Sequence, residues 1–233
     1  MVSNNEQAAA LSAAQFDALY RSRLQKLATS NLSDALDKLG LNGAVIGIVP
    51  QWGNTKVIGR AVTIQMTAAG AVQSKSHLGV DAIQNSSPGD VIVIDNRGDL
   101  QNNCWGEILS MGALKQGVSG VVVDGAVRDV DTCEDFGFPV HARGTVPITA
   151  RGRIVQEAWN IPIRLGNIAV HPGDIVVADI NGVVVVAIEH IERVLAAAED
   201  IFNKEAQMVE ALRSGRSMVE VDRQFNYEQM LKK

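Results

Sequence analysis

The feature that most constrains the fold is an alternation of β-branched runs with helical stretches in the first half of the chain. β-Branched residues favour strands, whereas apolar residues three or four positions apart favour helices. The alternation predicts, in order, Val57–Met66 as strand, Ala71–Asn85 as helix, Val91–Asp95 as strand, Gly106–Gln116 as helix and Val118–Asp124 as strand. Such an order is typical of an α/β sandwich.

Helices are predicted at both ends of the chain. Apolar residues from Phe16 to Leu27 recur at helical spacing, and Ser30–Leu36 offers an N-cap for a second helix that ends at Gly40. Ile191–Leu212 carries a long helical pattern with charges on one side. We therefore expect an N-terminal helical segment over 1–30 and a C-terminal helical extension over 190–233. A length of 233 residues allows one large α/β domain or two small ones.

Two segments of the chain echo one another. Ser87–Asp95 and His171–Asp179 each contain a Pro-Gly-Asp turn, an apolar run and a final acid. After the first comes a polar, glycine-containing segment, 96–103, which predicts a binding loop that opens onto a helix. After the second comes Ile180-Asn181-Gly182, a hairpin signal that predicts scaffold.

Composition excludes several classes of function. The net charge is −5 with both signs spread along the chain, so no basic stripe is available for nucleic acid. No apolar run approaches the roughly 18–20 residues that cross a bilayer, and the start, MVSNNEQAAALSAAQ, lacks the basic and apolar regions of a signal peptide. We expect no membrane association and a cytoplasmic protein. The two cysteines, Cys104 and Cys133, are too few for a disulfide scaffold.

The segment DGAVRDVD places Arg128 and Asp129 side by side just after the apolar run Val121–Val123. Neighbours on a strand or helix point apart, so we expect each side chain to face a ligand rather than the other. A guanidinium can grip a carboxylate or an enolate, and a carboxylate can hold Mg²⁺ with waters completing its shell. Glu107, 21 positions before Arg128, could close the same site. Spacing alone leaves a surface loop as the alternative.

Three stretches together carry a family resemblance. They run from Pro88-Gly89-Asp90 to Trp105-Gly106-Glu107, from Gly120 to Asp129 and from Gly137 to Gly144. They resemble the RraA-like family, which includes divalent-metal class II aldolases acting on 4-hydroxy-4-methyl-2-oxoglutarate and 4-carboxy-4-hydroxy-2-oxoadipate. The resemblance spans roughly Leu32 to Gly215, and it implies a single domain over 1–233 with an α/β/β/α sandwich.

The resemblance implies a role for each residue of the predicted site. Asp129 would bind the metal directly, Glu107 would hold metal-bound water, and Arg128 would bind the keto oxygen of the substrate and stabilise the enolate. Backbone amides of four residues would receive the pyruvyl carboxylate: Asp99, Leu100, Gln101 and Asn102. Arg97, Arg143, Arg151 and Arg153 are candidates for distal carboxylates of the substrate.

The resemblance also implies an assembly. In the aldolases a C-terminal glutamate reaches the metal site of a neighbouring subunit, and Glu205 stands at the matching place. The protein would then be a homo-oligomer, a trimer or a hexamer, with active sites between subunits. One position departs from the aldolase pattern, because Thr132 stands where a second acid is expected.

The implied activity is that of a carbon–carbon lyase. It would cleave 4-hydroxy-4-methyl-2-oxoglutarate-type keto acids to pyruvate with Mg²⁺, Mn²⁺ or another divalent metal. Oxaloacetate decarboxylation would accompany it, because both reactions pass through the pyruvate enolate. The alternatives are a non-catalytic protein-binding regulator, as in the ribonuclease-regulating relatives, and a lyase or hydratase acting on another acid. Glu107, Arg128, Asp129 and the C-terminal extension favour the enzyme.

Overall fold

The computed structural model of the protein describes residues 11–70, 72 and 77–226. The helices are α1 (Ala13–Phe16), the π-helix η1 (Asp17–Arg21), α2 (Ser22–Leu24), α3 (Thr29–Lys38), α4 (Val80–Gln84), α5 (Glu107–Gln116), α6 (Val130–Asp135), the 3-10 helix η2 (Ile188–His190), α7 (Ile191–Arg213) and α8 (Met218–Phe225). The strands are β1 (Ala44–Val45), β2 (Val49–Pro50), β3 (Val57–Ala68), β4 (Val91–Asn103), β5 (Gly120–Val127), β6 (Val140–Thr145), β7 (Ile154–Trp159), β8 (Ile163–Leu165), β9 (Ile168–Val170), β10 (Ile175–Asp179) and β11 (Gly182–Val186).

One large mixed sheet organises the described residues. Its order is β1-β11-β10-β3-β4-β5-β6-β2, with β7 paired to β3 and with β8 and β9 forming a separate pair. Strands β3, β4, β5 and β6 are parallel to their neighbours in this series, whereas β10 runs antiparallel to both β3 and β11. The parallel strands all end at one edge, and that edge therefore receives the segments that follow β4 and β5.

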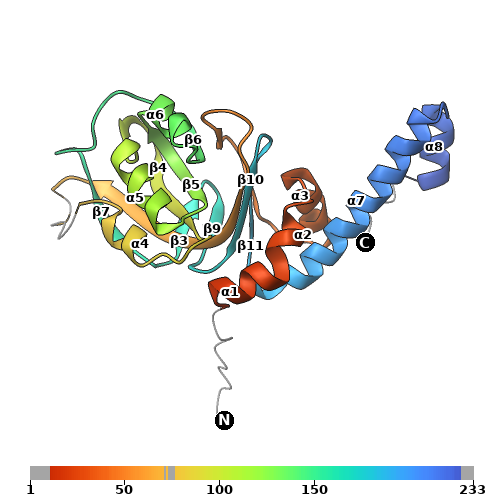
Figure 1. The fold of residues 1–233 in the computed structure, drawn as a ribbon, viewed down its shortest axis with the longest axis horizontal. Helices are drawn as coiled ribbons and strands as arrows, with labels where there is room; N and C mark the ends of the chain where they lie inside the picture. Colours follow the sequence, from red (N-terminus) through yellow and green to blue (C-terminus); the bar gives the residue numbers. More distant parts are fainter. Residues whose placement is uncertain (1–10, 71, 73–76, 227–233) are drawn as a thin grey trace, which may run out of the picture.

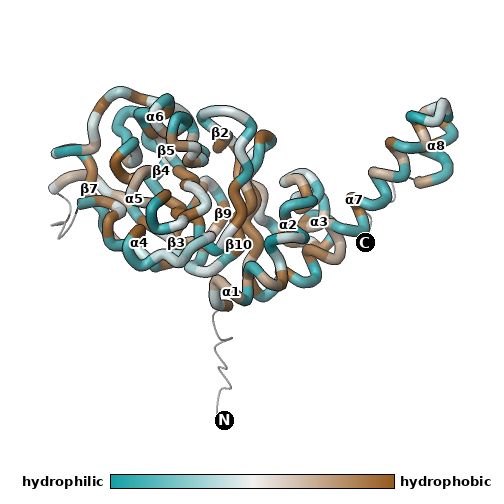
Figure 2. Tube along the Cα trace, viewed as in Figure 1, coloured by the Kyte–Doolittle hydropathy of each residue, from teal (hydrophilic) through white to brown (hydrophobic). Residues whose placement is uncertain are grey.

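Alternating side chains of the strands build a four-layer core. On β4, Ile92 packs with residues of α4, α5 and α6, while its neighbour Val93 packs with residues of β10 and β11. On β10, Val176 joins that inner cluster and Val177 faces the N-terminal helices and α7. The layers are therefore α/β/β/α, as predicted, with apolar strands at the centre and terminal helices outside (Figures 1 and 2).

The predicted N-terminal helices are present, but the second does not start at the expected cap. Helix α3 begins at Thr29, with Ala28 at the N-cap position. The backbone amide of Thr29 donates to Asp179 Oδ2 at 2.8 Å, and its hydroxyl donates to Oδ1 at 2.7 Å. An acid at the end of β10 therefore caps this helix, a contact between positions far apart in the sequence.

The prediction of a helix over Ala71–Asn85 is wrong in its extent. The helix in this region is α4, Val80–Gln84, while residues 71 and 73–76 of the predicted span lie outside the described residues. Gly79 adopts a left-handed conformation with φ 78° directly before α4. Its amide donates to Gln156 Oε1 at 2.8 Å, which fixes the start of the helix against β7.

The loop predicted over 96–103 is wrong as secondary structure, because β4 continues through these residues as an irregular strand, and their role in binding stays a prediction. Its register against β5 shifts between Asp95 and Asp99 and again between Asp99 and Asn103. The freed amides find acidic acceptors, since Asp95 Oδ1 accepts from Arg97 N at 2.9 Å and Asp99 Oδ1 accepts from Gln101 N at 2.7 Å. The hairpin predicted after Asp179 is confirmed by the pairing of β10 with β11.

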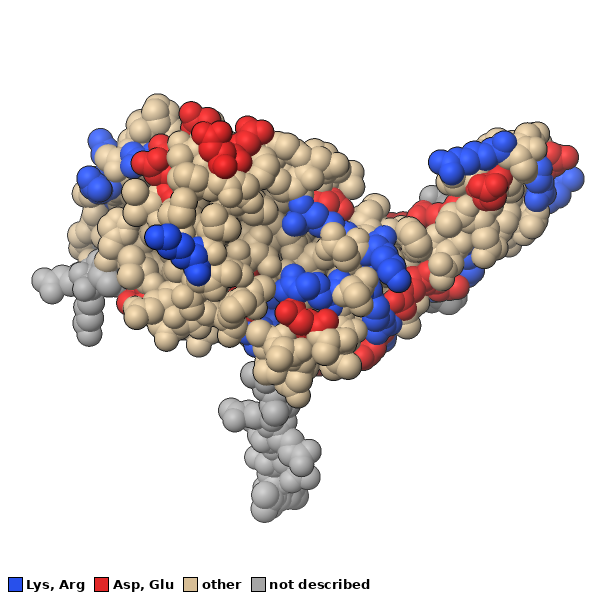
Figure 3. Space-filling model, viewed as in Figure 1, with Lys and Arg blue, Asp and Glu red and all other residues tan. Residues whose placement is uncertain are grey.

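The C-terminal helical extension predicted over 190–233 is confirmed up to residue 226 as α7 and α8, which project from the body of the molecule (Figure 1), and 227–233 lie outside the described residues. Ile191 to Ile201 includes the buried positions that pack on the N-terminal helices, whereas Phe202, Val209 and Leu212 further along are exposed. None of the described helices is long and apolar enough to cross a membrane. On the face drawn in Figure 3, charges of both signs mix over the terminal helices.

Candidate active site

Strand β5 delivers Arg128 and Asp129 to the edge where the parallel strands end. Every residue of β5 is buried, and the chain first reaches partial exposure at Arg128. The amide of Arg128 donates to the carbonyl of Trp105 at 3.0 Å. This bond joins the end of β5 to the segment that leads into α5, whose first residue is Glu107. The sheet therefore brings the predicted acid and the Arg-Asp pair together.

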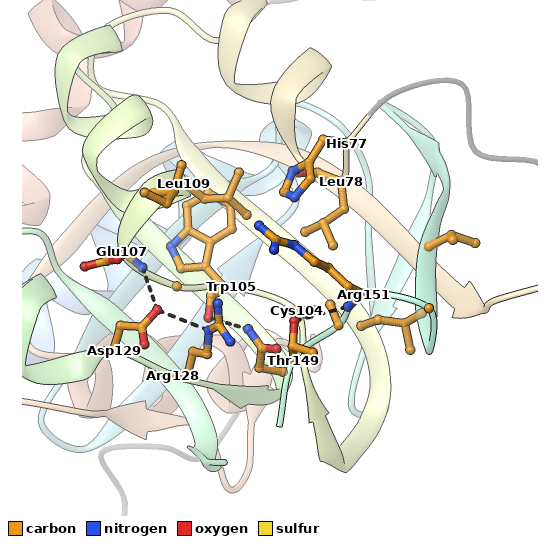
Figure 4. Close-up of a pocket in the computed structure, with 17 residues that line it drawn as sticks. His77, Leu78, Cys104, Trp105, Glu107, Leu109, Arg128, Asp129, Thr149 and Arg151 are labelled. Atoms are coloured by element: carbon orange, nitrogen blue, oxygen red, sulfur yellow. Dashed lines mark hydrogen bonds and ion pairs between the residues drawn. The ribbon is translucent and has the colours of Figure 1, made fainter. Parts of the chain in front are cut away.

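These residues line one cavity of about 320 Å³. Its walls come from four segments, residues 77–78, 103–109, 128–129 and 149–155 without Arg153. Figure 4 shows Glu107, Arg128 and Asp129 on one side of it. A concave site of this size with a few polar groups among apolar ones suits a small organic ligand.

Asp129 has a backbone conformation that few residues adopt. Its φ of 54° and ψ of 39° are left-handed, which asparagine and aspartate tolerate best among residues with a side chain. In this conformation Asp129 Oδ2 lies 3.2 Å from Arg128 Nε and accepts from the amide of Glu107 at 3.3 Å. The expectation that the adjacent charges diverge is wrong, because it assumed a regular strand or helix at this position.

The Arg128–Asp129 contact leaves polar groups unused. Arg128 Nε is buried, and its N–H has no well-aligned acceptor among the described residues despite the short ion-pair distance. Asn103 Oδ1, also in the cavity wall, is buried without a donor in the same part of the chain. Buried polar atoms usually have partners, so such groups at a cavity mark a place for a polar ligand or water.

Gly106 allows the start of α5 to approach this pair. A Cβ at this position would lie 2.6 Å from Asp129 Oδ2 and 3.3 Å from Arg128 Cγ. The first distance is shorter than real Cβ contacts, so any side chain would displace the carboxylate. The glycine is therefore required by close approach rather than by backbone freedom.

Trp105 forms a fixed apolar surface beneath the cavity. It is 1% exposed, its Nε1 donates to Ser110 Oγ at 2.8 Å, and its ring stacks on Phe138 with centroids 6.4 Å apart. Because the indole nitrogen is bonded and the ring stacks on Phe138, the wall beside Arg128 is pre-formed.

The acidic oxygens of the cavity suit a cation that keeps most of its water. Among the described residues, no hydrogen bond reaches Asp129 Oδ1 or the carboxylate of Glu107. No group of three or more His, Cys, Asp or Glu side chains in this part of the chain could hold a metal ion. Mg²⁺ binds through one or two carboxylates and several waters, whereas structural zinc requires four protein ligands. The donor set therefore fits Mg²⁺ or Mn²⁺.

The N-terminus of α5 adds a site for an anion. The N-cap residue Gly106 has no side chain to cap this ten-residue helix, and Asp129 Oδ2 accepts only from its first amide, that of Glu107. The first turn, Glu107 to Leu109, lines the cavity, and no described residue accepts from the amides of Ile108 and Leu109. Free amides and the helix dipole at such a position favour a carboxylate. The sequence predicted a polar segment that opens onto a helix start here, and the structure brings that helix start, rather than residues 99–102, to the cavity.

The family of the chain follows from comparison with known proteins. The RraA-like model, described as Aldolase/RraA, matches residues 29–185. The chain belongs to the RraA-like family. The matched residues include the whole described cavity lining, whereas α7 and α8 lie outside the matched range.

Two curated relatives illustrate the range of the family. A protein of Halalkalibacterium halodurans named "Putative 4-hydroxy-4-methyl-2-oxoglutarate aldolase" is 36% identical over 190 residues, which cover 81% of this chain and 85% of that protein. Protein DlpA of Legionella pneumophila is 32% identical over 209 residues, which cover 88% of this chain. The chain spans only 34% of the length of DlpA.

Two solved structures share the fold of this chain. An uncharacterized protein from Pseudomonas syringae pv. tomato superposes with a TM-score of 0.77 at 32% identity, covering 86% of this chain and 96% of that one. RraAS2 of Streptomyces coelicolor, described as an unusual member of the RNase ES inhibitor RraA protein family, gives 0.71 at 25% identity, covering 84% and 97%. The fold is therefore shared by two proteins that are described differently, one as uncharacterized and the other as a member of an inhibitor family.

Other residues that the RraA-like resemblance singled out lie away from the cavity. The stretch Asp99–Asn102 does not line it, and the amides of Gln101 and Asn102 donate to Asp99 Oδ1 at 2.7 and 3.3 Å. Burial alone would raise the pKa of Asp99, but these bonds and one from the Asn102 side chain hold it below its ordinary value. Thr132 and its acidic neighbours on α6 are likewise absent from the described lining.

Glu205 lies on α7, on the opposite side of the sheet from the cavity. Its Oε2 accepts from Asn31 Nδ2 of α3 at 2.8 Å. Within one chain it is therefore not part of the cavity, and its predicted approach to a neighbouring subunit remains a prediction.

The four arginines considered for distal carboxylates separate in the structure. Arg151 lines the cavity that holds Arg128. Arg97 and Arg143 line a second cavity of about 640 Å³ around Asp95 and Asp124. Arg153 belongs to neither lining.

Proposed function

We propose that the cavity is the active site of a metal-dependent carbon–carbon lyase. It would cleave 4-hydroxy-4-methyl-2-oxoglutarate-type keto acids to pyruvate and would also decarboxylate oxaloacetate. The observation that carries the proposal is the meeting of Arg128, Asp129 and Glu107 at one cavity beside the start of α5. The name of the H. halodurans relative supports the same class of reaction.

The proposed substrate would bind by its pyruvyl end. Its carboxylate would accept from the first amides of α5, at the positive end of the helix dipole. Its keto oxygen would face Arg128, whose guanidinium donates from a planar fork. Trp105 would support the flat pyruvyl group from below.

Asp129 would hold the divalent cation directly, with Glu107 reaching it through water. When bound, the cation would supply a Lewis acid that polarises the keto group. The protein's own contribution is Arg128, which stabilises the negative charge that moves onto the keto oxygen while the C3–C4 bond breaks. The C4 hydroxyl gives up its proton as C4 becomes a carbonyl, and C3 gains a proton to complete pyruvate. Glu107, with no partner among the described residues, is placed to hold that proton in transit.

Loss of CO₂ from oxaloacetate would use the same groups. The C3–C4 bond breaks, its electron pair forms the same enolate at Arg128, and a proton again adds to C3. No additional residue is required, so the two activities should be lost together.

A second candidate is a non-catalytic regulator that binds other proteins. The similarity to RraAS2, described as belonging to an inhibitor family, is the observation that favours it. A regulator of this kind would not require Asp129 Oδ1 or the left-handed backbone of Asp129. The lyase and the regulator therefore differ in whether their function depends on Asp129.

We also propose a cytoplasmic homo-oligomer, a trimer or a hexamer, in which Glu205 approaches a neighbouring site. The exposed apolar residues Phe202, Val209 and Leu212 on α7 support contact with another subunit. Sedimentation would measure the assembly directly.

The test of the proposed function is pyruvate release measured with lactate dehydrogenase. Oxaloacetate and 4-hydroxy-4-methyl-2-oxoglutarate would be supplied with Mg²⁺ or with EDTA. We expect release only with metal, and a fall of about 100-fold or more in Asp129→Asn. The substitution removes the carboxylate that would hold the cation, and a cation that stabilises developing charge contributes about that much. Asparagine is chosen because it tolerates the left-handed backbone.

Asp131→Asn is the matched control, because Asp131 is exposed on α6 and outside the cavity lining. It should retain full activity. Absence of pyruvate from both substrates with a folded wild-type protein would overturn the lyase proposal and leave the regulator.

A further inference from the structure

The cavity contains a second positive charge that the proposed chemistry does not use. Arg128 and Arg151 are the two arginines of the described lining, and they arrive from different segments, one after β5 and one between β6 and β7. Figure 4 shows the Arg151 side chain reaching into the cavity on the side away from Glu107 and Asp129, near His77 and Thr149.

The guanidinium of Arg151 is not committed to any described residue. The backbone amide of Arg151 donates to Thr149 Oγ1 at 3.3 Å, but no carboxylate or carbonyl in the described part of the chain accepts from the side chain. His77, its neighbour at the cavity, directs Nδ1 to the carbonyl of Leu78 at 3.2 Å and supplies no negative charge.

The other three arginines that could recognise an acid are already engaged. Arg97 contacts Glu157 at 3.1 Å, Arg153 donates to the carbonyl of Thr149 at 3.3 Å, and Arg143 donates to a buried aspartate in the second cavity. Arg151 therefore differs from them both in its position and in its free donors.

Much of the cavity wall beside the two cations is apolar. Leu78, Trp105 and Leu109 all contribute to it. A ligand that spans this wall would need a negative group at each end and a short hydrocarbon centre. A guanidinium fork binds a carboxylate through two parallel, charge-assisted hydrogen bonds, which is the strongest common recognition of that group.

We propose that Arg151 binds the distal carboxylate of the substrate and restricts this site to dicarboxylic 2-keto acids. The identity of the pyruvyl end rests on the proposed function, whereas the recognition of a second carboxylate rests on Arg151 alone. Arg151 is thus a specificity-determining residue, and Arg128 acts at the reacting end.

Binding of non-cleavable ligands tests the proposal without turnover. 2-Oxoglutarate carries both carboxylates, and 2-oxopentanoate has the same carbon chain with a methyl group in place of the distal one. In calorimetric titrations with Mg²⁺, we expect wild type to prefer 2-oxoglutarate by about 10- to 100-fold, the range for a hydrogen-bonded charge pair. Arg151→Gln should bind both ligands alike, whereas the control Arg153→Gln should keep the preference.

A kinetic arm separates this proposal from the lyase itself. 4-Hydroxy-4-methyl-2-oxopentanoate would yield pyruvate and acetone, and it lacks only the distal carboxylate of 4-hydroxy-4-methyl-2-oxoglutarate. A loss in Arg151→Gln that is confined to the dicarboxylate, mainly in KM, supports the proposal. Equal losses on both substrates overturn it while the lyase stands.

The lyase proposal can also fail while the distal-carboxylate proposal stands. If wild type cleaves neither substrate but binds 2-oxoglutarate through Arg151, the distal site stands and the lyase falls. If wild type shows no preference for 2-oxoglutarate in titration, the distal site is overturned whatever the activity.

Discussion

Two Arg–Asp pairs lie at the ends of neighbouring strands, and the structure uses them differently. Arg143 and Asp124 meet in the second cavity, where Asp124 Oδ1 accepts from Arg143 Nε and Oδ2 accepts from Gly166 N at 2.6 Å. Arg143 Nη1 donates further to the carbonyl of Ile46 at 3.1 Å. Both oxygens of this carboxylate are engaged, and its side chain is only 7% exposed.

The pair of Arg128 and Asp129, by contrast, has hydrogen-bonding groups without a partner among the described residues. Asp129 is 31% exposed, one of its oxygens has no donor among the described residues, and Arg128 Nε has no aligned acceptor there. A satisfied buried pair fixes the fold, whereas an unsatisfied pair at a cavity keeps its hydrogen-bonding capacity for a ligand. The comparison predicts that one pair can be broken with loss of activity and the other with loss of stability.

The largest expected effect is on catalysis. Arg128→Gln should lower kcat/KM for 4-hydroxy-4-methyl-2-oxoglutarate by about 100- to 1000-fold, because it removes the donor facing the developing negative charge. The free energy of unfolding should change by less than about 0.5 kcal/mol, as for a substitution that breaks no satisfied contact. Coupled pyruvate assays and urea unfolding measure the two quantities.

Arg97→Gln is the control for charge, since Arg97 is 59% exposed at the second cavity. Its kcat/KM should equal that of wild type. A large loss of stability in Arg128→Gln would show that this pair is structural after all.

The second prediction concerns the satisfied pair. Asp124→Asn should lower the free energy of unfolding by about 2–3 kcal/mol, because Arg143 loses its charged acceptor in a buried setting. Urea unfolding at pH 7 measures this loss, and Asp129→Asn is the matched comparison, with a change below about 0.5 kcal/mol. Equal destabilisation by the two substitutions would remove the distinction between the pairs.

The parts of the site that the sequence predicted are those fixed by local patterns. The apolar run of β5 and the helical pattern of α5 place Arg128, Asp129 and Glu107 at neighbouring ends of a strand and a helix, since each element follows from its own residues. The layer order follows from the same periodicities together with the family resemblance.

What the sequence did not predict depends on distant contacts or on unusual backbone. The irregular course of β4 after Asp95 is stabilised by acids that accept from freed amides, and no periodicity signals such bonds. The side chains of Arg128 and Asp129 were expected to point apart, but the left-handed conformation of Asp129 brings them into contact. Arg151 could not be separated from three other arginines until the fold placed it in the cavity.

The smallest expected effect concerns Asp179, a third acid that is satisfied like Asp124. Burial alone would raise the pKa of Asp179, but hydrogen bonds from Thr29 and Asn181 hold it below its ordinary value. A carboxyl whose pKa is lower in the folded state stabilises the fold above its unfolded pKa, and this contribution is lost as the pH falls through the folded value. Asp179→Asn should therefore cost about 1 kcal/mol at pH 7, because the amide keeps one acceptor oxygen for the helix start but loses the second acceptor and the charge that strengthens these hydrogen bonds. The difference from wild type should shrink toward acid pH in urea unfolding measured from pH 7 down to 3. A difference that stays constant with pH would mean that Asp179 stabilises the start of α3 by its hydrogen-bond geometry and not by its charge. Asp179 would then differ from Asp124, whose charge is expected to stabilise the fold.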